Sequence, residues 1–557
     1  MGMSTAYNET EKTWRAPSNK NNYPKAVGLG QLILQKLKET DPEKVLEVEN
    51  ESGNSLTAGQ IRSKTITVAQ NLIRLGIKKD DIVIVFSKSS IKISPITFAL
   101  YTIGATVNFF YLELKGEDIE YFFELFNPTA ILYEEQFKNS VFQALKNVKL
   151  SNLKHIISLD SQTESVDEVL FKPTKEDIEN FQPPDIGHPD KAVAVLAFTT
   201  GSTGKPKIST FSHSMLLLGI HNKWWQKMDS ESVVCVLSDL RWTCQIQIMI
   251  QPIFFGCKRV YTSKCEKDYD ESSEYELLHK NKVTHFLTIP ILLMQTLKNA
   301  ENANQTSKLS HLRIILTGGE VVSDPLIKYA GEILPNCQIV NGYGMTELPG
   351  VLATDELVLD RYVNGGTLMS GYQLKVIDEN GNHLGPNEKG RLCFKPIVPL
   401  IGYFKNEEAN KEHFKGDDGW FTTADYGFMD SDNLLHVVIR YDYLLRFNGQ
   451  FIVPTKLEDV INYHPNVFAA ALVGHPDPEN KDSDIGTMFV ALNDYSHRDV
   501  MENEILALLR ANFTKEEAKL VQYLKILDEI PIVNNCKVNR TLLKKMASNE
   551  CEKSLKI

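Results

Sequence analysis

The stretch Leu196-Ala-Phe-Thr-Thr-Gly-Ser-Thr-Gly-Lys-Pro-Lys207 joins an apolar run to a loop of small, hydroxylated and basic residues. The apolar run, Ala192 to Phe198, predicts a buried strand. In the loop, glycines let backbone amides converge on a phosphate, hydroxyls add donors, and lysines supply positive charge. The loop differs from a Walker loop, because no glycine stands five residues before Gly204 and Pro206 follows Lys205. It predicts a phosphate-binding loop; the alternative is a solvated polar turn.

The composition of the chain is that of a globular protein. Its 557 residues are too many for one ordinary core, so we expect two or more domains. Hydrophobic residues make up 42% and charged residues 24%, which is the usual balance. The net charge of −11 argues against nucleic-acid binding. A polyanionic substrate must therefore be met by local lysines and arginines.

The cysteines and the ends of the chain bear on its location. The eight cysteines are scattered and form no Cys-x-x-Cys pair, so we expect no zinc site or disulfide framework, and a reducing compartment fits. The first residues contain no apolar signal core, and lysines and serines interrupt the most apolar region, Ile82 to Tyr111. The last residues, Ser554-Leu-Lys-Ile557, differ from a peroxisomal Ser-Lys-Leu ending. We expect a cytoplasmic protein without a membrane span.

Helical and strand-like patterns alternate from Leu29 onward, after a polar stretch (residues 1–27) that we expect to be a flexible arm. The expected helices span 32–37, 61–75, 95–103 (with Ser94 as N-cap), 244–255 and 291–297, and the expected strands span 81–86, 129–133, 233–237 and 285–288. Two further strands are expected to end in glycine turns, at Gly318-Gly319 and at Gly342-Tyr-Gly344. This alternation predicts a largely parallel sheet covered on both faces, with a nucleotide pocket at its carboxyl edge.

The pattern changes in the last third of the chain. Short strand-like runs with Asn/Gly turns predict a small β subdomain at about 363–436. Residues 441–557 read as a small α+β lid. The predicted fold class is therefore α/β: a large N-terminal domain (28–440) of layered α/β sheets with a small β subdomain, followed by a mobile α+β C-terminal domain.

The phosphate-loop stretch resembles that of the AMP-forming adenylating enzymes. This superfamily holds acyl- and aryl-CoA synthetases, beetle luciferases and peptide-synthetase adenylation domains, and the resemblance covers most of the chain. It implies a loop that binds ATP through Thr199, Thr200, Gly201, Ser202, Thr203, Gly204 and Lys207. The chemistry that it implies joins a carboxylate to the α-phosphate of ATP, which requires Mg²⁺ and cationic side chains.

A second motif of the family is matched by Asn341-Gly-Tyr-Gly-Met-Thr-Glu347. The resemblance implies that Tyr343 stacks on adenine, Thr346 contacts a phosphate and Glu347 ligates Mg²⁺. A glutamate oxygen is a suitable hard ligand, and the glycines let the backbone pass close to the base. Read alone, Gly-Tyr-Gly is an ordinary turn. The implied nucleotide- and acyl-binding residues in this part of the chain are Gly318, Gly319, Glu320, Asn341, Gly342, Tyr343, Gly344 and Met345.

Later motifs complete the resemblance. Asp425 matches the acid that accepts both ribose hydroxyls, and Arg440 matches the arginine that contacts ribose or phosphate. The stretch from Ile530 to Arg540 resembles the last motif, Pro-x₅-Lys-x-x-Arg. Its Lys537 is then the lysine that bridges the substrate carboxylate and the α-phosphate.

Three single residues also fit family positions. His213 follows the phosphate loop and is implied to face the acyl group. Asp442 falls on the hinge about which the small domain swings, and Gly449 lies along the tunnel by which coenzyme A enters. Each of them, taken alone, reads as an ordinary structural residue.

The chain departs from the family pattern at several places. Ile208 replaces a glycine after the loop lysine, and Glu320-Val321 replaces Ala-Pro at the floor of the acyl pocket. Arg446, Asn448 and Phe451 replace Lys, Lys and Gln around Gly449. The segment Ser238 to Thr243 lacks the expected histidine and contains Arg241 instead. If Arg241 lines the acyl pocket, it favours an acid with a second carboxylate or polar end, unless it pairs with Glu320.

We therefore expect an adenylate-forming ligase that uses ATP, Mg²⁺ and coenzyme A on a small-molecule carboxylic acid. The alternative in another class is a luciferase-like oxygenase that acts through an acyl-adenylate. A third possibility is a nucleotide- and acyl-binding protein that has lost turnover. The sequence does not identify the acid.

Overall fold

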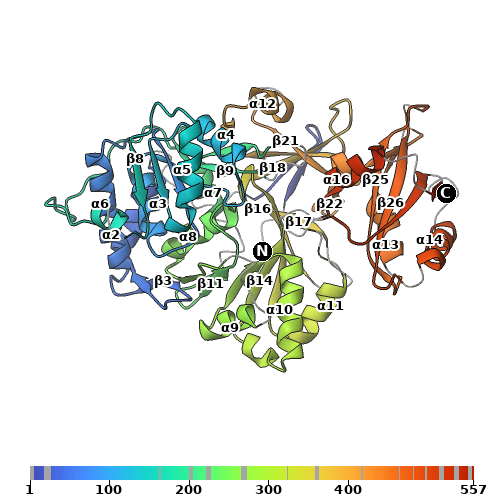
Figure 1. Ribbon diagram of the computed structural model, residues 1–557, viewed down its shortest axis with the longest axis horizontal. Coiled ribbons are helices and arrows are strands. Elements are labelled where there is room, and N and C mark those ends of the chain that lie inside the picture. Colours follow the sequence, from blue (N-terminus) through green and yellow to red (C-terminus); the bar gives the residue numbers. More distant parts are fainter. Residues whose placement is uncertain are drawn as a thin grey trace. The chain divides into compact units, whose positions relative to one another are not determined.

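The computed structural model (Figure 1) divides into two compact units, and each is described by itself. The large unit comprises residues 1–375, 393–422 and 429–436, and the small unit comprises 376–392, 423–428 and 437–557. The predicted boundary after Arg440 stays a prediction. The structure describes residues 5–17, 27–161, 165–199, 205–220, 227–264, 272–320, 322, 324–357, 363–414, 418–448, 450–462, 464–480, 482–495, 498–512, 520–531, 538–549 and 555–556.

The first sheet has the strand order β1-β2-β18-β19-β21-β22-β17-β16-β15-β14-β13-β11-β12-β3-β4. From β15 to β3 the strands are parallel, so their carboxyl ends lie at one edge. The strand bounds are β1 Ala6–Asn8, β2 Thr13–Arg15, β3 Val45–Glu49, β4 Ser55–Thr57, β11 Val233–Val236, β12 Lys258–Tyr261, β13 His285–Thr288, β14 Ile314–Gly318, β15 Gln338–Met345, β16 Leu348–Glu356, β17 Gly365–Leu368, β18 Tyr372–Ile377, β19 Gly390–Pro396, β21 Phe421–Met429 and β22 Leu434–Arg440.

The second sheet has the order β20-β10-β9-β6-β5-β7-β8, and the strands from β9 to β8 are parallel. Its strands are β5 Ile82–Phe86, β6 Thr106–Phe109, β7 Ala130–Tyr133, β8 His155–Ser158, β9 Val193–Phe198, β10 Ile208–Ser212 and β20 Gly402–Tyr403. The run Ile82-Val-Ile-Val-Phe86 shows why this sheet is apolar on both faces. Val83 and Val85 lie in one hydrophobic cluster, and Ile84 and Phe86 lie in another, as the two-residue period of a strand requires.

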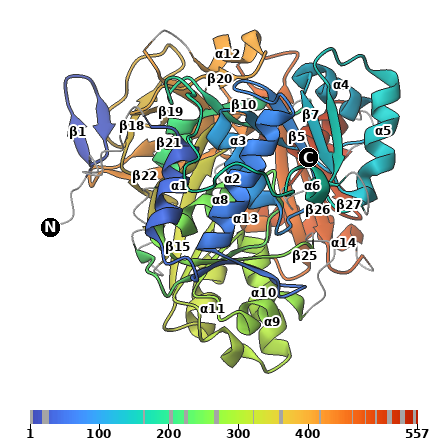
Figure 2. The same cartoon turned by 90° about the vertical axis from the view of Figure 1, so that its left-hand side faces the viewer.

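Helices cover both sheets. Their bounds are α1 Leu29–Glu39, α2 Ala58–Arg74, α3 Ile93–Ile103, α4 Glu117–Phe126, α5 Lys138–Asn147, α6 Val166–Val169, α7 His213–Ile220, α8 Thr243–Phe255, α9 Ser273–Lys280, α10 Pro290–Asn302, α11 Asp324–Ile333 and α12 Glu407–His413. Helices α1, α2 and α3 pack side by side (Figure 2), and α9, α10 and α11 bury their apolar faces in a separate cluster. This arrangement confirms the predicted α/β class with a parallel sheet core.

Some local predictions were wrong for identifiable reasons. Ser94 is not an N-cap, because α3 begins at Ile93 and the Ser94 hydroxyl donates to the buried Glu47 carboxylate at 2.6 Å.

The Gly342-Tyr-Gly344 segment is not a turn after a strand. It belongs to β15 itself, which pairs antiparallel with β16, and the register shifts between Tyr343 and Met345. The hairpin turn falls at the following residues, Thr346 and Glu347.

The expected flexible arm is also corrected, for residues 5–17. Strands β1 and β2 form a hairpin, and β2 pairs with β18 through Trp14 and Leu374. Trp14 is 0% exposed and packs against Tyr7 with ring centroids 4.7 Å apart. The burial of a large aromatic side chain gives this segment a defined place on the sheet.

The strands expected in a separate β subdomain, β17 to β22, continue the same large sheet, apart from β20.

The small unit is an α+β structure. Its strands β25 Val467–Pro476, β26 Asp484–Leu492, β27 Val521–Leu527 and β28 Leu555–Lys556 form a four-stranded sheet, and β23 Leu445–Phe447 pairs with β24 Gln450–Ile452. Its helices are α13 Pro454–Asn462, α14 Arg498–Asn512 and α16 Arg540–Asn549. Across the residues described in both units, no helix combines the length and apolarity that crossing a membrane requires.

Candidate active site

The phosphate-loop stretch connects two antiparallel strands. Phe198 of β9 pairs with Ile208 of β10, and the Thr199 N–H donates to the Lys207 carbonyl at 2.8 Å. The loop is therefore closed at its base by strand pairing. Ile208, which stands where the family pattern has a glycine, is buried in the cluster that contains Phe198. Thr200, Gly201, Ser202, Thr203 and Gly204 lie outside the described residues.

The two lysines of the loop have different partners. The Lys205 ammonium lies 3.4 Å from the Asp118 carboxylate and 4.1 Å from the centroid of the Tyr121 ring, both on α4. The Lys207 ammonium instead lies 3.3 Å from Nε2 of His413 and 5.2 Å from the centroid of the Tyr403 ring. Of these two lysines, Lys207 lies beside a residue that contacts the second motif, and its role in binding ATP stays a prediction.

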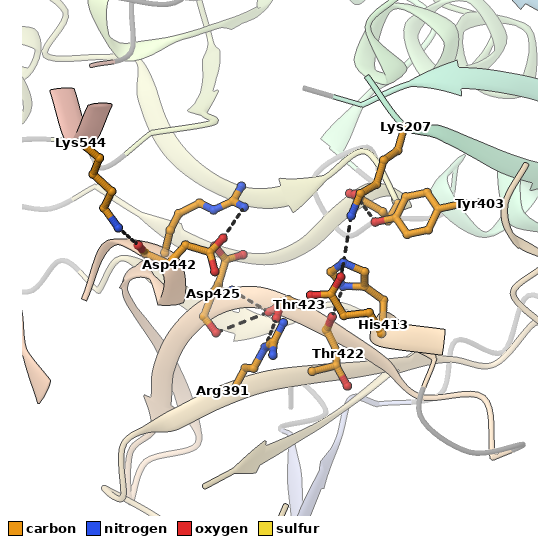
Figure 3. Close-up of polar contacts among 12 residues, drawn as sticks. Lys207, Arg391, Tyr403, His413, Thr422, Thr423, Asp425, Asp442 and Lys544 are labelled. Atoms are coloured by element: carbon orange, nitrogen blue, oxygen red, sulfur yellow. Dashed lines mark hydrogen bonds and ion pairs between the residues drawn. The ribbon is translucent and has the colours of Figure 1, made fainter. Parts of the chain in front are cut away.

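Tyr403 connects the loop to the predicted magnesium ligand. It reaches this position because β20 pairs with β10, with Tyr403 opposite Ser209. Its hydroxyl donates to Oε1 of Glu347 at 2.7 Å. Figure 3 shows Lys207 directed toward His413, with Tyr403 beside it. A loop cation and a motif carboxylate therefore meet at one buried tyrosine.

His413 has a fixed tautomer. Its Nδ1 lies 2.9 Å from the Thr422 carbonyl, which can only accept, so Nδ1 carries the proton. Nε2 of the neutral ring then has a free lone pair, and it accepts from the Lys207 ammonium. The ring stacks on Phe421 at an interplanar angle of 13°, and the residue is 7% exposed. The orientation of the lone pair is thus set by buried contacts.

The strand ends of the first sheet bring the second motif together with Gly318. Strands β14 and β15 pair with Gly318 opposite Gly342, and a Cβ added at Gly318 would lie 2.1 Å from the Gly342 carbonyl oxygen. Gly319 has a φ of +87°, which favours glycine, and Glu320 follows it. Asn341 is buried, and its Nδ2 has no hydrogen-bond partner among the described residues. An unpaired amide donor at this edge suits a ligand that carries an acceptor.

Arg241 is paired, but not with Glu320. Its Nε donates to both oxygens of Asp239 at 3.1 Å, and its Nη2 lies 3.9 Å from the Glu113 carboxylate. The guanidinium stacks 3.9 Å from the centroid of the Tyr111 ring. Burial raises the pKa of Asp239, and the charge of Arg241 opposes that shift. Because the Arg241 charge is paired, it no longer favours an acid with a second carboxylate. The partner is Asp239, whereas the sequence suggested Glu320.

The Arg241 cluster lies close to the phosphate loop. The Tyr111 ring is 6.0 Å from that of Phe198, the residue before Thr199. Tyr111 follows β6, Arg241 follows β11, and Phe198 ends β9, so each comes from the carboxyl end of a parallel strand. This edge is where ligands bind in open α/β sheets.

His213 lies in the core of the large unit. Its Nδ1 accepts from the Leu29 N–H at 3.2 Å, and its ring lies 6.0 Å from that of Tyr101. Burial lowers the pKa of His213 to about 4, so the ring is neutral near pH 7. Its predicted contact with the acyl group stays a prediction.

The small unit holds the predicted ribose ligands. Asp425 lies within β21, and its backbone N–H is fixed by the Thr423 hydroxyl at 3.0 Å. The Arg440 guanidinium lies 3.6 Å from the Asp442 carboxylate, and the Asp442 carbonyl accepts from Lys544 at 2.6 Å (Figure 3). Lys537 and Gly449 lie outside the described residues.

Two residues of the site, Tyr403 and His413, were missed by sequence reasoning. Gly402-Tyr403 and the helix that ends at His413 carry no chemical pattern that marks them. Among the described residues, no group of three or more His, Cys, Asp or Glu side chains could hold a metal by itself. A single carboxylate such as Glu347 nevertheless suits Mg²⁺, which is commonly held by one or two carboxylates together with substrate phosphates.

Comparison with known proteins identifies the family. Residues 34–404 match the AMP-binding enzyme family, and the chain belongs to it. A putative acyl-CoA ligase, YdaB, of Bacillus subtilis (strain 168) is 26% identical over 509 residues, which is 90% of this chain and 96% of that protein. The 4-coumarate-CoA ligase 1 of Narcissus pseudonarcissus is 25% identical and covers 99% of both chains. A luciferin 4-monooxygenase of Photuris pensylvanica is 25% identical over 86% of this chain and 87% of that protein.

A solved structure has the same fold. The anthranilate CoA ligase AuaEII, in complex with anthranoyl-AMP, superposes with a TM-score of 0.80 at 19% identity, over 95% of this chain and 98% of that one. The family match and the named relatives make the protein an enzyme of the adenylate-forming ligase class, as the motifs predicted.

Proposed function

We propose that the enzyme activates a small carboxylic acid to an acyl-adenylate and then transfers the acyl group to coenzyme A. In the first step, a carboxylate oxygen attacks the α-phosphorus of ATP, and pyrophosphate leaves. In the second step, the thiol of coenzyme A loses its proton and attacks the acyl carbonyl, and AMP leaves. The observation that carries the proposal is the meeting of Lys207 and Glu347 at Tyr403.

The residues of the large unit have distinct proposed roles. Lys207 donates to phosphate oxygens, Thr346 contacts a phosphate, and Tyr343 stacks on adenine. Glu347 would hold Mg²⁺, which when bound neutralises phosphate charge and polarises the phosphoryl oxygens. Asn341 supports the nucleotide assignment, because its buried amide donor lacks a partner.

Residues of the small unit would complete the reaction. Asp425 accepts the ribose hydroxyls, and Arg440 contacts ribose or phosphate. Lys537 bridges the acid and the α-phosphate, and Gly449 lines the entry of coenzyme A. Because Lys537 and Gly449 serve different steps, we propose a rotation of the C-terminal domain about Asp442 between them.

The Arg241 cluster supports a proposal about the acid. Arg241 is neutralised in place by Asp239 and faces Glu113 as well, so the cluster carries no net positive formal charge. An acid with a single carboxylate and an uncharged remainder fits this environment better than a diacid, since a second carboxylate would gain no unpaired cation.

The test is an ATP–pyrophosphate exchange screen over fatty, aromatic and amino acids, followed by product analysis with and without coenzyme A. Acid-dependent exchange and a thioester product would support the proposal. Oxygen consumption without coenzyme A would instead favour a luciferase-like oxygenase, to which the Photuris relative gives some support. Absence of pyrophosphate release with every acid would point to a binding protein without turnover.

A further inference from the structure

Two opposite charges approach the same tyrosine in the large unit without neutralising each other. The Lys207 ammonium lies over the Tyr403 ring, 5.2 Å from its centroid, and the Tyr403 hydroxyl binds the Glu347 carboxylate. No ion pair joins Lys207 to Glu347, although the structure describes both side chains. Both side chains are long and flexible, and an ion pair between them would use the charge of each.

Each charge has a neutral partner instead. Lys207 donates to the lone pair of the neutral His413 ring, and Glu347 accepts from the Tyr403 hydroxyl. Both partners are held rigidly: Tyr403 is buried, and its ring contacts those of His413 and Phe421 edge-on. Among the residues that the structure describes, the carboxylate that forms a close contact with His413 is that of Glu412, 3.7 Å from Nε2, and its side chain is 57% exposed.

These contacts leave part of each group available. An ammonium has three donors, so after the bond to His413 Lys207 retains two for phosphate oxygens. Glu347 uses Oε1 to accept from Tyr403, and its Oε2 makes no hydrogen bond to the residues that the structure describes. This oxygen can serve as one ligand of a hydrated Mg²⁺, which is commonly held by one or two carboxylates together with water and substrate phosphates.

We propose that His413 and Tyr403 are positioning residues that hold Lys207 and Glu347 apart, so that both keep their charge for Mg·ATP. This inference rests on the proposed function for the identity of the ligand. Neither residue touches the reacting atoms. They act by preventing an internal ion pair that ATP and Mg²⁺ would otherwise have to break before they bind.

The His413 part of the proposal is tested with three variants of His413. His413→Phe keeps the aromatic stacking and loses both nitrogens. His413→Asn retains a donor at the place of Nδ1, and His413→Gln places an amide oxygen near the position of Nε2, where it can accept from Lys207. Lys411→Met, an exposed change on the same helix, is the control. The readouts are the Kd for Mg·ATP by calorimetry, the KM for ATP, kcat in exchange, and the Tm without ligand.

We expect the Phe and Asn variants to raise the Kd and KM for Mg·ATP roughly tenfold with a smaller change in kcat, as expected for a displaced binding group. His413→Gln should recover most of the affinity. In a Lys207→Met background, His413→Phe should have no further effect. A purely structural role would lower the Tm of all three variants without separating Gln from Asn, and that outcome would overturn the proposal. So would an unchanged ATP affinity in His413→Phe.

The Tyr403 part of the proposal is tested with Tyr403→Phe. This variant keeps the ring under Lys207 and removes only the hydroxyl, so the Mg²⁺ concentration for half-maximal ATP binding should rise. An unchanged Mg²⁺ titration would contradict the role of Tyr403. A wild-type enzyme that binds Mg·ATP but activates no acid would contradict the proposed function. In that case the ATP affinities of the variants would still decide whether His413 and Tyr403 hold Lys207 and Glu347 apart.

Discussion

Arg540 and Glu458 form a buried, two-pronged ion pair across 82 positions of the small unit. The two Nη groups of Arg540 lie 2.6 and 2.7 Å from the two carboxylate oxygens of Glu458, and their side chains are 10% and 6% exposed. Arg540 also donates to the Leu472 carbonyl at 2.9 Å. Arg540 is the arginine of the last family motif and begins α16, three residues after Lys537. These contacts fix the first residue of α16 against the buried Glu458 carboxylate.

Replacing Arg540 with lysine should destabilise the small unit strongly. Lysine cannot bind both oxygens, and a buried carboxylate left incompletely paired costs about 3–5 kcal/mol. The matched control is Arg446→Lys, because the Arg446–Glu379 pair is about half exposed (50% and 52%) and such pairs contribute about 0–1 kcal/mol. Denaturant unfolding of both variants checks the difference, and equal losses would contradict it.

His213 should make stability depend on pH. The ring has a pKa of about 4 in the folded chain and 6.5 as a free group, so the unfolded chain binds the proton first as the pH falls. This contribution is complete above pH 6.5 and is lost as the pH falls toward 4. It amounts to about 2 kcal/mol between pH 7 and pH 5. His213→Asn keeps an acceptor for the Leu29 N–H and cannot titrate, so its stability should fall less over this range. If the free energy of unfolding depends on pH equally in the variant and the wild type, His213 is not the source of the pH dependence.

Glu347→Gln should weaken the dependence on magnesium. Glutamine keeps the volume and can still accept from Tyr403, but it removes the negative charge that a hard cation prefers. The Mg²⁺ concentration for half-maximal exchange should rise at least about tenfold. Glu408→Gln, an exposed change on α12, serves as the control. A titration that overlays the wild type would assign the metal to another acid.

Lys537→Ala should slow acyl-adenylate formation by about 10²–10³, the effect of losing one preorganised charge at a developing anion. Transfer from supplied acyl-adenylate to coenzyme A should survive. Pyrophosphate release and thioester formation are measured separately, with the exposed Lys545→Ala as control. If Lys537→Ala releases pyrophosphate as fast as the wild type, Lys537 does not carry the adenylation step.

Asp239→Asn should change the preferred acid. The substitution keeps a partner for the Arg241 Nε and removes one negative charge from the cluster, so only the Glu113 carboxylate, 3.9 Å from Nη2, still balances the guanidinium. Diacids should gain about tenfold in kcat/KM relative to monoacids of the same length. Asp430→Asn, at the Asp430–His436 pair, is the control. An unaltered ranking would mean that the Arg241 cluster does not contact the acyl group.

The parallel sheets were predictable because their signals are local. Runs such as Ile82 to Phe86 are apolar on both faces, and only a strand covered by helices on both sides buries them completely. The phosphate-loop stretch and the Glu347 motif could be predicted for a similar reason, since each is a short continuous stretch, and their roles stay predictions. The family resemblance then supplied their roles.

Other features depend on contacts that no local pattern reveals. Tyr403 reaches Lys207 because a two-residue strand pairs with β10, and His413 reaches it from a short helix with no chemical signature. The partner of Arg241 is two residues away, yet the choice of Asp239 over Glu320 depends on how the loop after β11 folds. The strand through Gly342-Tyr-Gly344 was missed because glycines usually mark turns, and here β16 pairs alongside them.

The hairpin of β1 and β2 has a consequence for synthesis of the chain. Trp14 pairs with Leu374 of β18, which begins at Tyr372, so its strand partner is made long after Trp14 leaves the ribosome. At roughly 5–20 residues per second, the wait is tens of seconds. During that time Trp14 lacks this strand partner, and a chaperone that binds apolar segments can reach it. The β1–β2 hairpin is thus made well before the strand with which it pairs.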